Sequence, residues 1–173
     1  LKLNKEYFSQ GEILTRNLYK NSPFEIKNII IKDSSILSKL LFLKIQNKYL
    51  SLTNEDGSIN YAEYIQPNNY FSSDYFSGEL KIKQSFNELK KTLEDSKYYL
   101  VFPTINNLRK LISKGLEIKI LDYSANTISI SYSHSNPKFA QDICNSIAKE
   151  YLEYDLQKKA TSSVNIVEFI NAQ

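Results

Sequence analysis

The sequence of 173 residues has little of the chemistry that enzymes and metal sites most often use: one cysteine, Cys144, one histidine, His134, and four glycines. A single cysteine excludes an internal disulfide bond and a cysteine-based zinc site. A histidine-based metal site, or a triad of serine, histidine and an acid, would have to use His134. The glycines are scattered and form neither a Gly-x-Gly nor a Walker pattern, so no phosphate-binding loop is predicted.

Methionine is absent, arginine is rare and apolar runs are short. Runs such as Leu40–Leu43 are far shorter than the about 20 residues that span a membrane. No secretory signal opens the chain. Because there is no methionine to serve as a native start, and because a helical pattern continues to the last residues, we expect a soluble piece of a longer protein. The net charge is +3, and Arg16 and Arg109 are the only arginines, which argues against sequence-specific binding of nucleic acid.

The first half of the chain predicts short strands and two helices. A helix is expected over residues 12–18, because a residue that precedes proline avoids the helical conformation and Pro23 follows. Ser85 and Glu88 have the spacing of a capping box at the start of a second helix. The tyrosine-rich residues 58–77 have no clear periodicity and are predicted to be an irregular insert. Patterns of alternation and turn residues predict a strand over 24–31, a hairpin over 41–52, a turn over 54–58, and strands over 80–82 and 98–102.

The second half gives sharper patterns. A helix from residue 104 should end at Gly115 in a left-handed stop, and residues 116–120 and 127–132 should form an antiparallel pair with one buried face. Asn136 and Pro137 are typical of the start of a helix. Its apolar stripe is expected to pack on the sheet and consists of Ala140, Ile143, Ile147, Tyr151 and Tyr154.

These elements predict an α+β fold: a small mixed or antiparallel sheet packed against helices, with a long C-terminal helix that leads into a truncated helical arm. We expect residues 1–173 to form a single domain.

No catalytic, cofactor-binding or metal-binding residue is predicted. His134 lies in a connection between strand and helix, and a polar loop histidine is the favoured interpretation. The acidic pairs at 55–56 and 94–95 are interpreted as solvated surface, and so are the lysines at 81, 83, 90, 91, 97, 110 and 114. The aromatic residues of the middle segment are interpreted as packing groups, with stacking against sugars as the alternative; they are Tyr61, Tyr64, Tyr70, Phe71, Tyr75 and Phe76.

Residues 116–173 resemble the periplasmic domain of the chain-length determinant family, also called polysaccharide co-polymerases. The resemblance rests on order and spacing: strand 116–120, strand 126–132, then Asn136-Pro137, and helix residues Ala140, Asn145, Tyr151, Lys158-Lys159 and Phe169-Ile170. Asn136 stands where the family more often has aspartate, and either residue caps a helix. A second match, over residues 18–26, is similar to the segment before the first sheet strand in members that carry a tyrosine autokinase.

The resemblance implies an extracytoplasmic domain between two inner-membrane helices, which assembles into rings and governs the length and export of surface polysaccharide. The implied partners are further copies of the chain, the polysaccharide polymerase and export machinery, and the nascent polysaccharide, with no nucleic acid. The implied location is the periplasmic side of a bacterial inner membrane, and a cytoplasmic tyrosine kinase domain is implied for the parent protein. The alternatives are a carbohydrate-binding module that uses residues 61–76 and an enzyme centred on His134.

Overall fold

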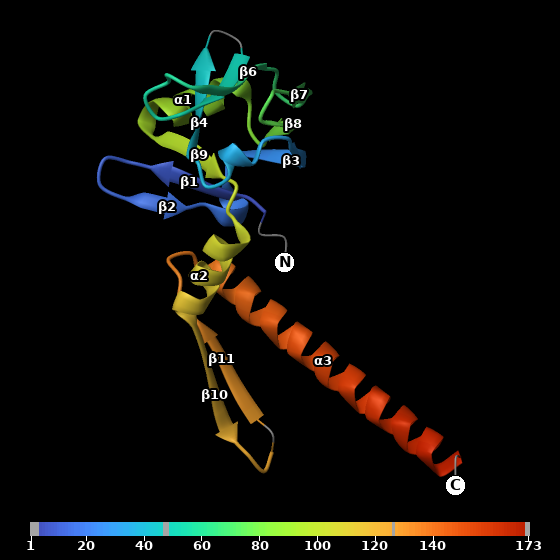
Figure 1. The fold of residues 1–173 in the computed structure, drawn as a ribbon. Helices are drawn as coiled ribbons and strands as arrows, with labels where there is room; N and C mark the ends of the chain where they lie inside the picture. The colour runs from blue at the N-terminus through green and yellow to red at the C-terminus, as the bar shows by residue number, and fades with distance from the viewer. Residues whose placement is uncertain (1–3, 47–48, 126, 172–173) are drawn as a thin grey trace. The chain divides into compact units, whose positions relative to one another are not determined.

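The computed structural model describes residues 4–46, 49–125 and 127–171, and it confirms the predicted α+β class (Figure 1). The chain divides into two compact units, residues 2–111 and residues 112–173, here called the N-terminal and C-terminal units. The expectation of a single domain stays a prediction. None of the helices in the described ranges is long and apolar enough to cross a membrane.

The N-terminal unit contains a six-stranded antiparallel sheet in the order β2-β1-β9-β4-β5-β6. Leu41 and Leu43 alternate with Phe42, so one face of the sheet receives the leucines. The predicted hairpin over 41–52 and strand over 98–102 are confirmed. The strands are β1 (Glu6–Gln10), β2 (Thr15–Asn17), β4 (Leu41–Gln46), β5 (Tyr49–Thr53), β6 (Asn60–Ile65) and β9 (Lys97–Val101).

The predicted helix over 12–18 is wrong, because this segment forms a hairpin. Gly11 N–H donates to the main-chain oxygen of Leu14 at 3.0 Å, which closes a turn between β1 and β2. The apolar residue Ile13 is 92% exposed at this turn, so it does not belong to a buried helix face. β1 is held by pairing with β9, a partner far along the chain that local periodicity does not reveal.

The prediction that residues 58–77 are irregular is also wrong. They contain β6, β7 (Tyr70–Ser72) and the start of β8 (Phe76–Ile82). The missing periodicity has a physical cause: the β5–β6 register shifts twice, and Tyr64 has a left-handed backbone with φ of 52°. Consecutive residues Tyr61 and Ala62 are therefore both buried, which removes the alternation of an ordinary strand.

A second sheet packs with the first around the core. It has the order β3-β8-β7 and begins with the predicted strand β3 (Phe24–Ile31). Helix α1 (Phe86–Asp95) adds Leu89 to the core, and its capping box is confirmed: Ser85 Oγ accepts from Glu88 N–H at 3.3 Å and Glu88 Oε2 accepts from Ser85 N–H at 2.8 Å. Short 3-10 helices lie at Tyr19–Asn21 and Ser34–Ile36. The large core side chains with no exposed surface include Phe24, Ile26, Ile36, Leu41, Leu50, Leu52, Ile65, Phe76, Leu80, Leu89 and Leu100.

The second half follows the predicted order of elements. Helix α2 (Ile105–Gly115) leads into β10 (Leu116–Asp122), which pairs with β11 (Thr127–Tyr132) in an antiparallel hairpin. Helix α3 (Pro137–Asn171) has 35 residues. The predicted cap is confirmed, since Phe139 N–H donates to Asn136 Oδ1 at 3.0 Å.

Three details of the C-terminal unit correct the sequence predictions. Gly115 does not have a left-handed backbone. A side chain does not fit at this position, because a Cβ there would lie 2.5 Å from the main-chain oxygen of Ser133. Among the described residues of the hairpin only Tyr132 is buried, and Ile118 and Ile120 are each more than half exposed, so most of the expected face is not covered. Helix α3 packs against β11 through its first turns, where Phe139 and Ile143 are buried.

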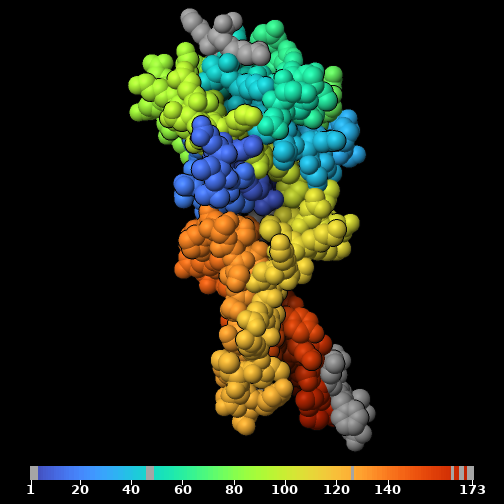
Figure 2. Space-filling view, turned by 90° about the vertical axis from the view of Figure 1, so that its left-hand side faces the viewer, coloured from blue at the N-terminus to red at the C-terminus, as the bar shows by residue number. Residues whose placement is uncertain are grey.

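Beyond those turns the helix and the hairpin diverge (Figure 1). Tyr151 and Tyr154, expected to pack on the sheet, are 48% and 63% exposed. In Figure 2 the outer face of the hairpin, coloured gold, lies open to the viewer.

Candidate functional site

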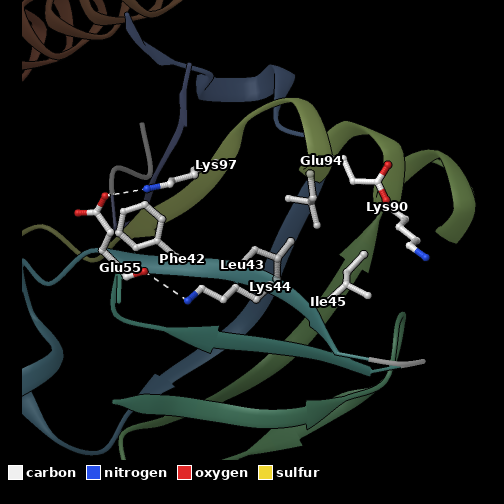
Figure 3. A pocket seen from close by; sticks show the side chains of 9 residues that line it. Phe42, Leu43, Lys44, Ile45, Glu55, Lys90, Glu94 and Lys97 are labelled. Atoms are coloured by element: carbon white, nitrogen blue, oxygen red, sulfur yellow. Dashed lines mark hydrogen bonds and ion pairs between the residues drawn. The ribbon is translucent and has the colours of Figure 1, made fainter. Parts of the chain in front are cut away.

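A hollow of the N-terminal unit lies beside the end of strand β4 and has a volume of about 370 Å³ (Figure 3). This volume is at the lower end of the range of ligand pockets. It is lined by consecutive residues of β4, by α1, by the start of β9 and by the turn after β5. The lining residues are Phe42, Leu43, Lys44, Ile45, Glu55, Lys90, Leu93, Glu94 and Lys97.

The hollow lies where β9 begins. β9 pairs with β4 only at Leu41, Phe42 and Leu43, whereas β5 pairs with β4 as far as Gln46. Among the described strands, none pairs with the β9 side of β4 from Lys44 to Gln46. Alternate residues of a strand direct their N–H and C=O groups to opposite neighbours, so one of Lys44 and Ile45 presents both groups at this edge.

The two faces of β4 give the hollow two kinds of side chain. Leu43 belongs to the core, and Ile45 and Leu93 pack against it, so one side is aliphatic. On the other side, Lys97 Nζ forms an ion pair with Glu55 Oε1 at 3.0 Å.

Lys44 Nζ donates to the main-chain oxygen of Glu55 at 3.3 Å, whereas the Glu55 carboxylate pairs with Lys97 (Figure 3). Lys44 also interacts electrostatically with the carboxylate of Asp56, so two lysines and two carboxylates meet on this side. Because the side chains of Lys97 and Glu55 are more than half exposed, their ion pair contributes little to stability.

The residues described around the hollow provide no nucleophile and base pair. None of those that line it is a histidine, cysteine, serine or threonine. In the described ranges, no group of three histidine, cysteine, aspartate or glutamate residues could hold a metal ion.

His134 lies in the connection from β11 to α3. Its Nδ1 accepts a hydrogen bond from Asn136 N–H at 3.0 Å. Its ring lies 4.5 Å from that of Phe139 and 6.1 Å from that of Tyr132, between centroids. Among the described residues, no carboxylate is hydrogen-bonded to His134, as an oriented catalytic histidine would require.

The acidic pairs do not converge. Glu55 turns toward Lys97, while Asp56 Oδ1 accepts from Ser58 N–H at 2.8 Å, and this bond holds the pKa of Asp56 below its usual value. Glu94 lies at the rim of the hollow, on another element. These two pairs therefore behave as surface groups.

The tyrosine-rich segment is divided by the structure between core and surface. Tyr61, Phe71 and Phe76 are buried, whereas Tyr64 and Tyr70 are 73% and 61% exposed. The sequence did not single out Tyr49, whose ring lies edge to face with that of Tyr64, with 5.8 Å between the ring centroids.

The lysines were predicted to be solvated surface, and Lys44 was not singled out by the sequence. The fold brings Lys44, Lys90 and Lys97 to one hollow from three elements. In the sequence, the only indication that Lys44 belongs to this group is its position between Leu43 and Ile45, which places it on the opposite face of the strand.

Comparisons with known proteins leave the family open. The chain matches no protein-family model, and neither the curated proteins nor the solved structures include a significant match.

Proposed function

We propose that the chain is an extracytoplasmic scaffold domain of a polysaccharide co-polymerase, which acts by assembly and contact in controlling the length and export of surface polysaccharide. The proposal starts from the resemblance of residues 116–173 to the chain-length determinant family. The order strand, strand, Asn-Pro cap and long helix, on which that resemblance rests, agrees with β10, β11, Asn136-Pro137 and α3.

The observation that carries the proposal is the apolar surface of α3. A helix of 35 residues is about 50 Å long, and only its first turns pack against β11. Exposed apolar side chains continue along the rest of it: Tyr151, Leu152, Tyr154, Leu156, Val164, Ile166, Val167 and Ile170. Apolar surface on this scale marks interaction sites more often than free surface. In a scaffold, neighbouring copies of the chain would cover it.

The remaining parts of the proposal concern the parent protein. It would be anchored in a bacterial inner membrane, would contact the polymerase and export machinery and the nascent polysaccharide, and would carry a tyrosine kinase domain on the cytoplasmic side. These statements rest on the resemblance, in particular on residues 18–26, and on no further observation.

The reading frame around residues 1–173 tests the proposal. An apolar segment of about 20 residues is expected on each side. A complete reading frame without such a segment on either side would contradict the assignment.

A carbohydrate-binding module is the second candidate, and the exposed tyrosines favour it. Tyr64 keeps a strained left-handed backbone while its ring is 73% exposed beside that of Tyr49. Strain of this kind is often found at functional positions. Titration with polysaccharide fragments should quench tyrosine fluorescence in the wild type and less in Tyr64→Ala. No response at millimolar fragment would remove this candidate.

A further inference from the structure

We propose that strand β10 pairs in antiparallel direction with β10 of a second copy of this chain, with Ile118 opposite its own copy on a twofold axis. The two hairpins would then form one four-stranded sheet. The inference rests on the edge and the charges of β10, and it does not depend on the proposed scaffold function.

The outer edge of β10 is open. In the described part of the chain, β11 is the one strand that pairs with β10, and α3 packs against β11. Figure 1 shows β10 on the side of the hairpin that is turned away from α3. All its residues from Glu117 to Asp122 are exposed. A two-stranded hairpin is only marginally stable in water, and a free edge is a template for a further strand.

The hydrogen bonds of the hairpin determine which backbone groups face this edge. Ser133 N–H donates to the oxygen of Gly115 at 2.9 Å, and the register is unbroken from there to Ile120. Bonded and non-bonded pairs alternate in an antiparallel ladder, so every second residue of β10 after Gly115 bonds to β11. Ile118 belongs to the other set and directs its N–H and C=O outward. Opposite its own copy, it can therefore exchange both hydrogen bonds with it.

The charges on β10 select this register. With the axis at Ile118, Glu117 lies opposite Lys119 of the second copy, and Lys119 lies opposite Glu117 of that copy. Opposite charges stabilise such a cross-strand pair and like charges destabilise it. An axis at Glu117 or at Lys119 would place each of these residues against its own copy. An axis at Leu116 or Ile120 would extend the pairing into α2 or across the register shift that follows Ile120.

These charges already interact within one chain. Lys119 Nζ lies 2.8 Å from Glu117 Oε1, and both side chains are more than half exposed. The contacts between copies therefore determine the register more than the strength of the dimer.

The apolar face of β10 is also complementary to itself. Ile118 and Ile120 share the face opposite the charges, and each is more than half exposed. In the paired sheet Ile118 would meet its own copy, and Ile120 would meet Leu116 of the second copy. A twofold pair of this kind uses the same patch on both partners. The backbone, the charges and the apolar face all fit the same occupant, a second β10.

Amide exchange in the wild-type chain, followed by NMR, tests the backbone contact. Ile118 N–H faces the open edge, so its exchange should be slower at millimolar than at micromolar concentration of the chain. The neighbouring amide of Lys119 bonds to β11 and serves as the control, because its exchange should not depend on concentration.

Cysteine variants test the register, and both are made with Cys144→Ser. In Ile118→Cys the two Cα atoms would lie about 5.5 Å apart, a distance that a disulfide bond spans. Ile120→Cys is equally exposed on the same face, but its two copies would lie about 13 Å apart along the strands. Mild oxidation at millimolar concentration should therefore give covalent dimers of Ile118→Cys, while Ile120→Cys stays monomeric on a non-reducing gel.

Charge variants test the identity of the partner. Glu117→Lys should weaken the dimer about tenfold in sedimentation equilibrium, because it places lysine opposite lysine twice. The double variant Glu117→Lys with Lys119→Glu exchanges the two charges and should restore dimerisation.

Three results would overturn the proposal: exchange at Ile118 that does not depend on concentration, equal cross-linking of the two cysteine variants, or no recovery in the charge-exchanged variant. A wild-type chain that stays monomeric at millimolar concentration would also overturn it, and would leave the edge to a strand of another protein.

Discussion

Replacing Gly115 with alanine should destabilise the C-terminal unit. A Cβ built on Gly115 lies 2.5 Å from the main-chain oxygen of Ser133 and 2.9 Å from ring atom Cε2 of Tyr132. The same two segments are joined by a hydrogen bond of 2.9 Å from Ser133 N–H to the oxygen of Gly115. The backbone therefore cannot move away from the new methyl group without lengthening this bond.

Two effects of opposite sign decide the magnitude. Overpacking costs about 1–3 kcal/mol, whereas loss of glycine's freedom in the unfolded chain contributes about 0.4–1 kcal/mol of stability. The contact involves main-chain atoms that yield little, so we expect a net loss of about 1–2 kcal/mol in the free energy of unfolding.

Gly11→Ala is the matched control. A Cβ on Gly11 meets only the oxygen of Leu14, at an ordinary distance of 3.7 Å. Thermal unfolding followed by circular dichroism should show a lower midpoint for Gly115→Ala and an unchanged or slightly higher one for Gly11→Ala, at about 2–4 °C per kcal/mol. Amide exchange should accelerate over residues 112–135 in Gly115→Ala. Equal midpoints and equal exchange in the two variants would refute the close approach of Gly115 to Ser133.

Three further changes test the N-terminal unit. Tyr7→Phe should cost about 1–3 kcal/mol in urea denaturation, because the buried Tyr7 hydroxyl accepts from Ile26 N–H at 2.8 Å and the amide would lose its partner; an unchanged midpoint would contradict this contact. Ser85→Ala should cost about 1 kcal/mol by removing the capping box of α1, with Ser96→Ala at the other end as control, and equal effects would argue against the cap. Burial raises the pKa of Glu6 despite a hydrogen bond from Asn17 Nδ2, so its ionised form weakens the folded state at pH values above the raised pKa, and stability recovers as the pH falls through it. Glu6→Gln should therefore raise the thermal midpoint near pH 7 and give no gain near pH 3, and a gain that is the same at both values would contradict this assignment.

The sequence predicted those elements whose signals are local. The cap at Asn136 and the capping box at Ser85 need only a few neighbouring residues, and both are present. The helix over 12–18 failed because pairing of β1 with β9, far along the chain, outweighed a weak local pattern. The strand at Tyr64 was missed because a bulge breaks the alternation on which strand prediction depends.

The exposed surfaces could not be predicted in the same way. Alternation in β10 and β11 indicates an apolar face but not whether another element covers it, and Ile118 remains half exposed. The hollow beside β4 depends on where β9 begins and on the path of α1, so Lys44 and Leu93 come to line the same hollow only in the fold.

The most direct test of the scaffold proposal is the length distribution of surface polysaccharide in cells whose parent gene carries Leu152→Asp and Leu156→Asp. These exposed leucines lie one turn apart on the same face of α3. Gel electrophoresis of the polysaccharide should show a shifted or broadened length distribution, while the exposed control Glu153→Gln leaves it unchanged. An unaltered distribution, with the double variant present at the wild-type level, would contradict the proposed function.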